Sequence, residues 1–268
     1  MTGKNIITVI QARMGSTRLP NKVMLSICGK PLLIRMAERV MRAELCGTLV
    51  IATSTNIEDD VIEDLCINEG LNYFRGHPTD LLDRHYKAAL KFNADAIAKI
   101  PSDCPLIDPV IIDKVYKLYL NNDFDFVSNL HPASYPDGND VEIFSFKTLE
   151  TAWNEADKDF EREHTTPFIW ERPDRFRIGN ITWETGKDFS ASHRWTIDYE
   201  DDYLFIRAIY EELYPHNPHF SMQDILTLIG EKPYLSNINN KFAGKYWYDK
   251  HLDELKNINE YKTKRTLK

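Results

Sequence analysis

The stretch NIITVIQARMGSTRLPNKVM, residues 5–24, decides how the chain is expected to fold. Its first part, residues 5–11, is a nearly unbroken apolar run rich in β-branched residues, which is typical of a strand buried in a parallel sheet. The run ends abruptly in a loop of Gly, Ser, Thr and Pro that carries Arg13, Arg18 and Lys22. Three cations crowded into such a loop, in a chain with a net charge of −8, indicate a binding site for an anion.

The rest of the N-terminal half alternates short β-rich runs with helical patterns. We expect strands at residues 48–53, 72–74, 95–100 and 124–129. We expect helices at residues 31–43, 58–70, 79–92 and 109–122. Pro31 in a first turn, Gly70 at a helix end and Thr79 as an N-cap mark three of their boundaries. This alternation predicts an α/β fold, a mostly parallel mixed sheet flanked by helices.

The second half of the chain has a more mixed pattern. We expect strands at residues 140–146, 175–183 and 194–198. We expect helices at residues 147–156, 160–171 and 200–214. These elements divide the chain into one domain, residues 1–215, and a C-terminal helical extension packed on it, residues 216–268. The last ten residues are polar and basic, and we expect them to fray.

Composition and charge argue against several classes of protein. The 43% hydrophobic and 28% charged residues are typical of a soluble globular chain, and a pI near 5.5 argues against nonspecific nucleic-acid binding. No run approaches 18 apolar residues and the N-terminus lacks the apolar core of a signal peptide, so we expect a cytoplasmic protein without a membrane span. The four cysteines form no C-x-x-C pair and no cluster with histidines, which predicts free thiols rather than a zinc site.

The opening loop has the residues that a polyphosphate requires. Gly15 and Ser16 let the backbone approach a ligand closely, and successive N–H groups in such a turn form an anion nest. Arg13 and Arg18 offer forked donors that match phosphate oxygens, and Lys22 adds a mobile point charge. Neither the Walker pattern nor G-x-G-x-x-G is present, so this is a phosphate loop of another kind.

Two carboxylates are placed to complete this site with a metal ion. Asp103 follows the strand expected at 95–100, and Asp198 ends the strand expected at 194–198. Ligands of parallel sheets bind beyond the carboxyl ends of the strands, so Asp103 should face the opening loop. Mg²⁺ usually takes one or two protein carboxylates and completes its shell with water and phosphate. The sequence therefore predicts Mg²⁺ bound by Asp103 and Asp198.

Five segments together resemble the cytidylyltransferase superfamily, with the SpsF-like spore coat polysaccharide proteins as the near branch and the acylneuraminate and 3-deoxy-manno-octulosonate cytidylyltransferases in the wider family. They are IQARMGSTRLPNKVM (10–24), SDCPLID (102–108), YPDGNDVEIF (135–144), EREHTTPF (161–168) and RWTIDYEDD (194–202). FSMQDILTLI (220–229) continues the near-branch pattern. The resemblance implies a Rossmann-like nucleotidyltransferase (nucleotide-diphospho-sugar transferase) fold, CTP as the nucleotide, Mg²⁺ as cofactor and a homodimer.

The resemblance also implies roles for residues around the nucleotide. The residues expected to contact the nucleotide are Ala12, Arg13, Gly15, Ser16, Arg18, Lys22, Arg84 and Ser102. Arg13, Lys22 and Asp103 are expected to act in the reaction itself, and Asp103 and Asp198 to hold the metal ion. The near branch usually has Gly at the positions of Asn21 and Ser102; asparagine tolerates left-handed backbone angles, so we expect Asn21 to be a mild change.

The second half should supply the site for the acceptor. Polar side chains cluster there and have the groups to hold sugar hydroxyls, and an anionic acceptor would need a cation, either Arg162 or Arg194. The expected acceptor-binding residues are Tyr135, Asp137, Asp140, Glu142, Arg162 and His164. The tryptophans are expected in the core or in subunit contacts rather than around a ligand; they are Trp153, Trp170, Trp183, Trp195 and Trp247.

The implied reaction is attack of an acceptor oxygen on the α-phosphorus of a nucleoside triphosphate, with release of pyrophosphate. The leading hypothesis is a CTP-dependent enzyme that activates a sugar or sugar acid as its CMP derivative for a surface polysaccharide or glycan. One alternative keeps the fold but uses another nucleotide and a phosphorylated or phosphonate acceptor. Two others are a glycosyltransferase that consumes a nucleotide sugar and a non-catalytic nucleotide-binding module.

Overall fold

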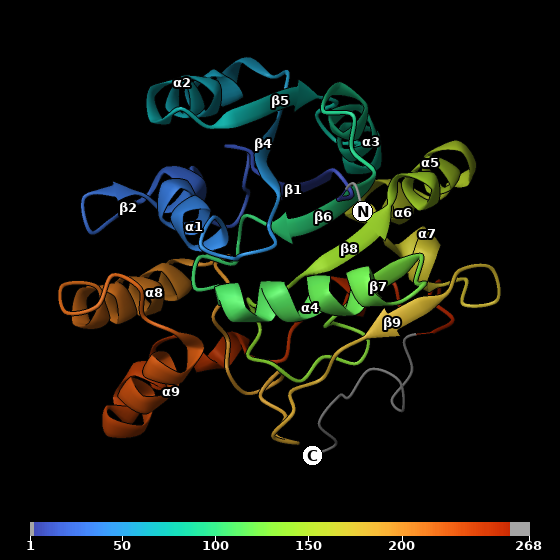
Figure 1. The fold of residues 1–268 in the computed structure, drawn as a ribbon. Helices are drawn as coiled ribbons and strands as arrows, with labels where there is room; N and C mark the ends of the chain where they lie inside the picture. The colour runs from blue at the N-terminus through green and yellow to red at the C-terminus, as the bar shows by residue number, and fades with distance from the viewer. Residues whose placement is uncertain (1–2, 258–268) are drawn as a thin grey trace.

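A seven-stranded sheet lies at the centre of the protein, seen in a computed structural model that describes residues 3–257 (Figure 1). Its strands are β1 (Ile6–Gln11), β4 (Thr48–Ser54), β5 (Asn72–Gly76), β6 (Ala96–Pro101), β7 (Phe126–Ser128), β8 (Glu142–Ser145) and β9 (Ile178–Asn180). Their order is β5-β4-β1-β6-β8-β7-β9. Only β8 runs antiparallel to its neighbours in this sheet, so the predicted mostly parallel mixed sheet is confirmed.

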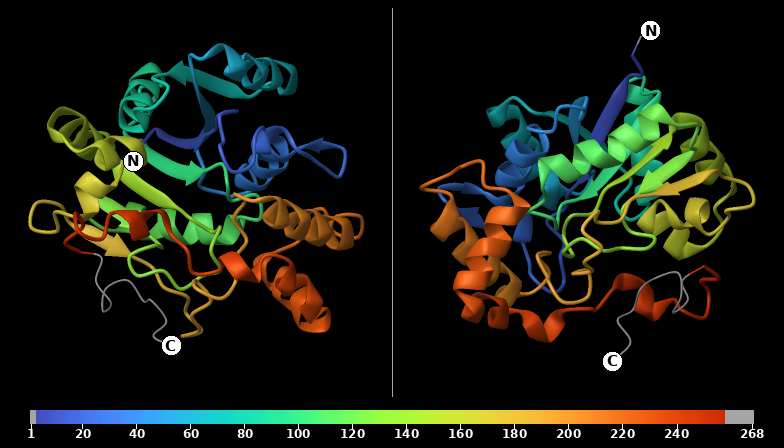
Figure 2. Two further views of the ribbon diagram at one scale, coloured as in Figure 1. Left: turned by 180° about the vertical axis from the view of Figure 1, so that it is seen from behind. Right: turned by 60° about the horizontal axis from the view of Figure 1, so that its bottom comes forward.

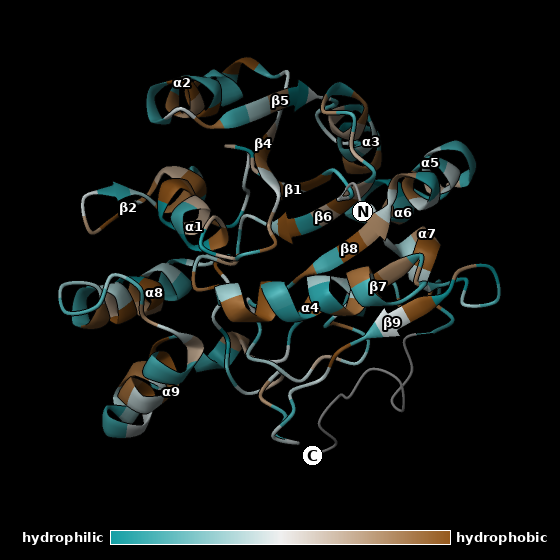
Figure 3. Cartoon of the chain, in the orientation of Figure 1, coloured by the Kyte–Doolittle hydropathy of each residue, from teal (hydrophilic) through white to brown (hydrophobic). Residues whose placement is uncertain are grey.

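Helices cover both faces of this sheet. One layer contains α1 (Leu32–Val40), α2 (Asp60–Glu69) and α4 (Pro109–Asn121). The other contains α3 (Leu81–Lys91), α5 (Phe146–Glu155), α6 (Asp159–His164) and α7 (Pro167–Trp170). In β1, Ile6 and Ile10 face the first layer and Ile7 and Val9 the second, because successive strand residues point to opposite faces. Figure 3 shows the resulting hydrophobic colour along β1 and β6.

The C-terminal part of the chain forms a third packing unit and then returns to the sheet. Helix α8 (Glu200–Leu213) packs against α9 (Met222–Glu231) and the 3-10 turn η3 (Pro233–Ile238). The chain then passes through η4 (Asn240–Phe242) and η5 (Trp247–Lys250) to reach the end of α7, as the red segment in Figure 2 shows. The basic tail expected to fray, residues 259–268, lies outside the described residues.

The remaining short elements lie at the edges of these layers. A hairpin of β2 (Ser26–Ile27) and β3 (Lys30–Pro31) precedes α1. The turn η1 (Lys22–Met24) ends the opening loop, and η2 (Ile57–Asp59) leads into α2. All four cysteines are free thiols. Within residues 3–257, every helix is too short or too polar to cross a membrane.

Three expectations about local structure are wrong. The N-cap of α3 is Asp80, whose carboxylate accepts a hydrogen bond from the backbone N–H of Asp83, and not Thr79. The helix expected at 160–171 is two helices, because Thr165 has a φ of 72° that α-helical geometry does not allow. The strand expected at 194–198 is a bent segment that makes one isolated bridge, between Arg194 and Asp137.

The position of the α3 cap has a measurable consequence. Replacement Asp80→Ala removes the cap and also the partner of the Arg162 guanidinium, which lies 2.6 Å from the Asp80 carboxylate. We expect a loss of about 1–2 kcal/mol in the free energy of unfolding, measured by urea denaturation. The matched control Thr79→Ala removes an exposed side chain and should change it by less than about 0.5 kcal/mol. Equal losses in the two variants would contradict the assignment.

Candidate active site

A cavity of about 930 Å³ opens at the carboxyl ends of β1 and β6. The opening loop forms one side of it, and the segments that follow β6 and β7 form the floor and the far side. The expected residues that line it are Ala12, Arg13, Ser16, Arg18, Lys22, Arg84, Ser102, Asp103, Tyr135, Asp137, Asp140, Glu142, His164 and Asp198. Its volume is at the upper end of what ligand sites offer, so there is room for a nucleotide and a second ligand.

The opening loop is held in a compact turn by its own backbone. The carbonyl of Met14 accepts hydrogen bonds from the N–H groups of Ser16 and Asn21, and the N–H of Met14 donates to the Asp59 carboxylate at 2.7 Å. Asn21 has a φ of 58°, in the left-handed region that asparagine tolerates better than most residues. Gly15 is exposed and does not line the cavity. Arg13 is exposed and lines the cavity, and its side chain makes no hydrogen bond or ion pair with another of the described residues.

The two expected metal ligands face a single cation. The Lys22 ammonium lies 3.1 Å from the Asp198 carboxylate and 4.0 Å from the Asp103 carboxylate, and it donates to the carbonyl of Ile197 at 2.8 Å. Arg18 also pairs with Asp198, at 2.6 Å. Two carboxylates that converge on one positive nitrogen have the chemistry of a site for a divalent cation. Within residues 3–257 no three His, Cys, Asp or Glu side chains are arranged to hold a metal ion, so a cation here would take two protein ligands at most from this set.

Hydrogen bonds to the backbone carbonyl of Asp103 bring Asp103 and Asp198 together although 95 positions separate them in the sequence. The carbonyl of Asp103 accepts from the N–H of Ile197 at 2.9 Å and from the hydroxyl of Thr196 at 2.9 Å. These bonds fix the bent segment 194–198 against the loop after β6. The carboxylates therefore meet because of a tertiary contact between two loops, and not because both end strands of the sheet.

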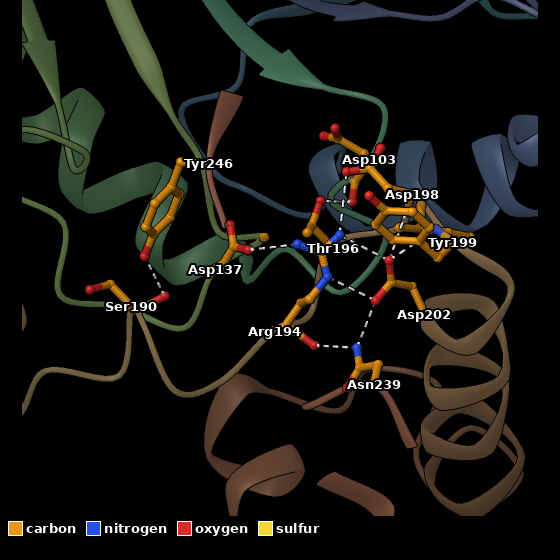
Figure 4. Close-up of polar contacts among 12 residues, drawn as sticks. Asp103, Asp137, Ser190, Arg194, Thr196, Asp198, Tyr199, Asp202, Asn239 and Tyr246 are labelled. Atoms are coloured by element: carbon orange, nitrogen blue, oxygen red, sulfur yellow. Dashed lines mark hydrogen bonds and ion pairs between the residues drawn. The ribbon is translucent and has the colours of Figure 1, made fainter. Parts of the chain in front are cut away.

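Arg194 lies at the centre of a buried polar network (Figure 4). Its side chain is 3% exposed, and two of its nitrogens each donate to a carboxylate oxygen of Asp202 at 2.9 Å. Asp198 and Asp137 lie 3.3 Å and 3.6 Å from the same guanidinium. Although burial by itself would lower the pKa of Arg194, the hydrogen bond and charge of Asp202 raise it, so the guanidinium stays charged. The Asn239 amide donates to the Arg194 carbonyl and to Asp202, both at 2.9 Å.

The turn that carries Asp137 and Asp140 is packed tightly against this network. Gly138 has a φ of 104°, and a Cβ there would lie 2.7 Å from the backbone of Trp195, so only glycine fits. Burial, and then the charge of Asp140, raises the pKa of Asp137 well above its usual range. Burial, and then the charge of Asp103, raises the pKa of Asp140 to about 7. Acid groups are thus crowded at the floor of the cavity, where a bound cation would be stabilised.

The far side of the cavity combines a buried ion pair with aromatic rings. Lys99 pairs with Glu142 at 2.5 Å, and the other oxygen of Glu142 accepts from the Thr166 hydroxyl at 2.6 Å. The His164 ring stacks on Trp247 with 3.7 Å between ring centroids. Burial lowers the pKa of His164 to about 3, so this ring is neutral at physiological pH.

Two expected site residues, Arg162 and Arg84, are held by partners within the protein. Arg162 does not line the cavity; its guanidinium is held by Asp80 and by the carbonyls of Trp153 and Ala156, so the structure does not bring it together with the other expected acceptor-binding residues. Arg84 lines the cavity but is 1% exposed and donates to the carbonyls of His77 and Pro78. Burial lowers its pKa to about 10.

The sequence analysis does not assign several residues of the site to it. They are Lys99, Thr166, Trp170, Asp202, Tyr246 and Trp247. Asp202 lies in a helical first turn, where an acidic residue needs no other explanation, and Lys99 lies within a buried strand. The sequence predicts tryptophans in the core or in subunit contacts, but Trp170 and Trp247 line the cavity, which no local pattern indicates.

Comparisons with known proteins identify what this chain resembles. The profile of the family described as "Cytidylyltransferase" matches residues 7–227. An uncharacterized protein of Methanocaldococcus jannaschii is 35% identical over 90% of this chain and 96% of its own length. The spore coat polysaccharide biosynthesis protein SpsF of Bacillus subtilis is 32% identical over 85% of this chain and 95% of its own. The solved structure of a cytidylyltransferase from Leptospira borgpetersenii is 31% identical and superposes with a TM-score of 0.82 over 87% of this chain and 97% of that one.

The dependence of the network on Asp202 can be tested by stability. Replacement Asp202→Ala leaves the Arg194 guanidinium buried without its bidentate partner, and we expect a loss of about 3–5 kcal/mol in the free energy of unfolding. The neighbouring control Asp201→Ala breaks only a surface pair with Lys241 and should cost less than about 1 kcal/mol. Denaturant unfolding of both variants measures the difference, and a small loss in Asp202→Ala would show that the network is not needed for folding.

Proposed function

Because this chain belongs to the cytidylyltransferase family and is therefore a nucleotidyltransferase, we propose that it transfers the cytidylyl group of CTP to a hydroxyl of a sugar or sugar acid and releases pyrophosphate. The observation that carries the proposal is the cavity in which the cations of the opening loop face Asp103 and Asp198. The similarity to the spore coat polysaccharide biosynthesis protein of Bacillus subtilis supports a role in the synthesis of a surface polysaccharide.

The opening loop would bind the triphosphate. Arg13 is exposed at the edge of the cavity and has a forked group that matches phosphate oxygens. Arg18 and Lys22 are both paired with Asp198, and a triphosphate would compete with that carboxylate for them. Once these cations contact phosphate, the oxygens of Asp198 become available to another cation. The pyrophosphate that leaves would remain neutralised by Arg13 and Lys22.

Asp103 and Asp198 would hold a divalent metal ion, which we propose to be Mg²⁺, because both are oxygen ligands that converge on one point. When bound, such an ion supplies charge neutralisation at the reacting phosphate. The protein's own contribution is positional: the backbone bonds of Asp103 to residues 196–197 fix both carboxylates before any ligand arrives.

The acceptor would lie on the far side of the cavity. Direct, in-line attack on the α-phosphorus needs no covalent enzyme intermediate, because positioning and charge neutralisation supply most of the catalysis in such transfers. Asp137 and Asp140 present carboxylate oxygens there, and Tyr135 and His164 contribute ring surfaces. Glu142 also lines the cavity, but its two oxygens are held by Lys99 and Thr166.

A nucleotide panel tests the proposal. Thermal unfolding is measured with CTP, UTP, GTP and ATP, each with and without Mg²⁺; a ligand at 100 times its Kd adds about 2.7 kcal/mol of stability. We expect CTP with Mg²⁺ to give the largest rise in unfolding temperature. Arg13→Ala should lose most of this rise, because the loop then lacks a guanidinium that donates hydrogen bonds to the phosphates. The control Arg207→Ala removes an exposed arginine outside the cavity and should leave the shift unchanged. A larger rise in unfolding temperature with another nucleotide would contradict the assignment of CTP.

The two carboxylates are tested by isosteric replacement. Asp103→Asn and Asp198→Asn keep the side-chain shape but remove the charge that would hold the metal ion. We expect pyrophosphate release to fall by about 100-fold or more in each variant, while the far-ultraviolet circular dichroism stays native. Turnover at the wild-type rate in either variant would contradict the metal assignment.

A further inference from the structure

A second pocket, of about 320 Å³, lies between α1 and α8, two helices that Figure 1 shows side by side. Among the described residues, none lines both this pocket and the active-site cavity. We call it the α1–α8 pocket, and its lining residues are Arg35, Glu38, Arg39, Met41, Arg42, Tyr210, Tyr214, Pro218 and His219. Its volume is near the lower end of the range for ligand sites, so a ligand here would be small.

Two of the arginines hold the walls of the pocket in place. Arg35 on α1 donates to the hydroxyl of Tyr214 on α8 at 2.6 Å. Arg39 is 3% exposed, and each nitrogen of its guanidinium donates to a backbone carbonyl. These carbonyls are those of Leu106, Ile107 and Phe220, at 3.3 Å, 2.8 Å and 3.1 Å. The pocket is therefore formed before any ligand arrives.

The lining carries more positive than negative charge. Glu38 is the one acidic residue among the described residues of the lining, and it is paired with Arg35 at 2.8 Å and with Lys30 at 3.1 Å. Arg39 and Arg42 form no ion pair with any carboxylate of residues 3–257. Two guanidiniums thus lack a counter-ion, although the chain as a whole is acidic.

Arg42 also has hydrogen-bond donors to spare. Within residues 3–257 its guanidinium makes one hydrogen bond, to the carbonyl of Pro218 at 3.5 Å, which is the limit for such a bond. Its Nη2 is buried and has no partner in the same part of the chain. A buried donor without an acceptor and a half-buried charge without a counter-ion both destabilise the fold, and an anion that binds here would remove both costs.

The two unpaired guanidiniums also act on each other. Burial lowers the pKa of Arg39, and the charge of Arg42 lowers it further. Asp108 opposes this effect, but its oxygens accept hydrogen bonds from the N–H groups of Val110 and Met222 instead of from either arginine. An anion in the pocket would relieve this repulsion between like charges.

We propose that the α1–α8 pocket binds phosphate or a small phosphate monoester, with Arg42 as the residue that contacts the phosphoryl oxygens. A phosphate monoester carries a charge of about −1.5 to −2 at neutral pH, which matches two guanidiniums, whereas one carboxylate would leave a charge unbalanced. The forked donors of Arg42 suit phosphoryl oxygens. Arg39 supplies charge alone, since carbonyls occupy its donors. The site is independent of the proposed function, because it does not require that CTP bind elsewhere.

Calorimetric titration of the full chain tests the proposal. All proteins carry Arg13→Ala, which weakens the opening loop as a competing phosphate site. Inorganic phosphate, glucose 6-phosphate and acetate are titrated at constant ionic strength, and the tighter of the two phosphate compounds identifies the form that is bound. We expect added Arg42→Ala to raise the Kd of that compound about tenfold or more, because a charged hydrogen-bonding group is lost. The control Arg207→Ala removes an arginine of α8 outside the pocket and should leave the Kd unchanged.

Three results would overturn the proposal. They are no binding of either phosphate compound, acetate binding as tightly as phosphate, and an equal Kd with and without Arg42→Ala.

A second variant guards against a loss of binding that comes only from misfolding. Arg42→Gln keeps part of the aliphatic stem but removes the charge. Without phosphate, we expect it to unfold at the same temperature as wild type or higher, because the repulsion with Arg39 is gone. With phosphate, it should gain less stability than wild type. A lower unfolding temperature without phosphate would show that the charge of Arg42 is already balanced within the protein, which contradicts the proposal.

CTP distinguishes this pocket from the active-site cavity. In the otherwise wild-type chain, Arg42→Ala should leave the stabilisation by CTP with Mg²⁺ unchanged, because Arg42 does not line the cavity. Loss of that stabilisation, with phosphate binding retained, would assign Arg42 to the nucleotide site and overturn the proposal. If CTP fails to stabilise even the wild type, the proposed function is contradicted, and the phosphate titrations still decide the α1–α8 pocket.

Discussion

The site depends on the buried guanidinium of Arg194. A buried charge destabilises a fold unless it is paired and hydrogen-bonded, and the partners of Arg194 come from separate parts of the chain. Asp202 belongs to the first turn of α8, Asp137 to the loop between β7 and β8, and Asn239 to the return of the C-terminal segment. Because all of them must reach one side chain, the floor of the cavity, the helix and the cavity wall are fixed together.

The same requirement explains why an acidic chain concentrates cations in its first loop. Lys22 and Arg18 are balanced by Asp198, and Asp198 is held in turn by Arg194. The loop is therefore stable without a ligand, although it carries three positive charges. In the proposed function a triphosphate replaces Asp198 as the partner of these cations, and a metal ion then binds the carboxylates. The same charged groups thus stabilise the folded state and act in the reaction.

The two sides of the cavity differ in how they are built. The side that we propose for the nucleotide consists of short loops that directly follow β1 and β6, at the edge of the sheet where ligands of such folds bind. The far side is assembled from distant segments: the pair of Lys99 and Glu142, the α6–α7 junction and the segment that carries Trp247. The segments of the far side lie beyond the sheet, so their side chains can differ without disturbing its strands.

The sequence by itself determined the elements with strong local signals. The β-branched run of β1, the alternation up to α4 and the residues of the opening loop follow from periodicity and composition, because these act over a few neighbouring residues. Asp103 was placed correctly at the edge of the sheet for the same reason. Only the tertiary structure decided that residues 194–198 form a bent segment, that Arg162 is held by Asp80, and that Asp202 and Trp247 belong to the site. These features are decided by which distant residues pair with a buried charge or line the cavity, and local sequence patterns do not show which residues those are.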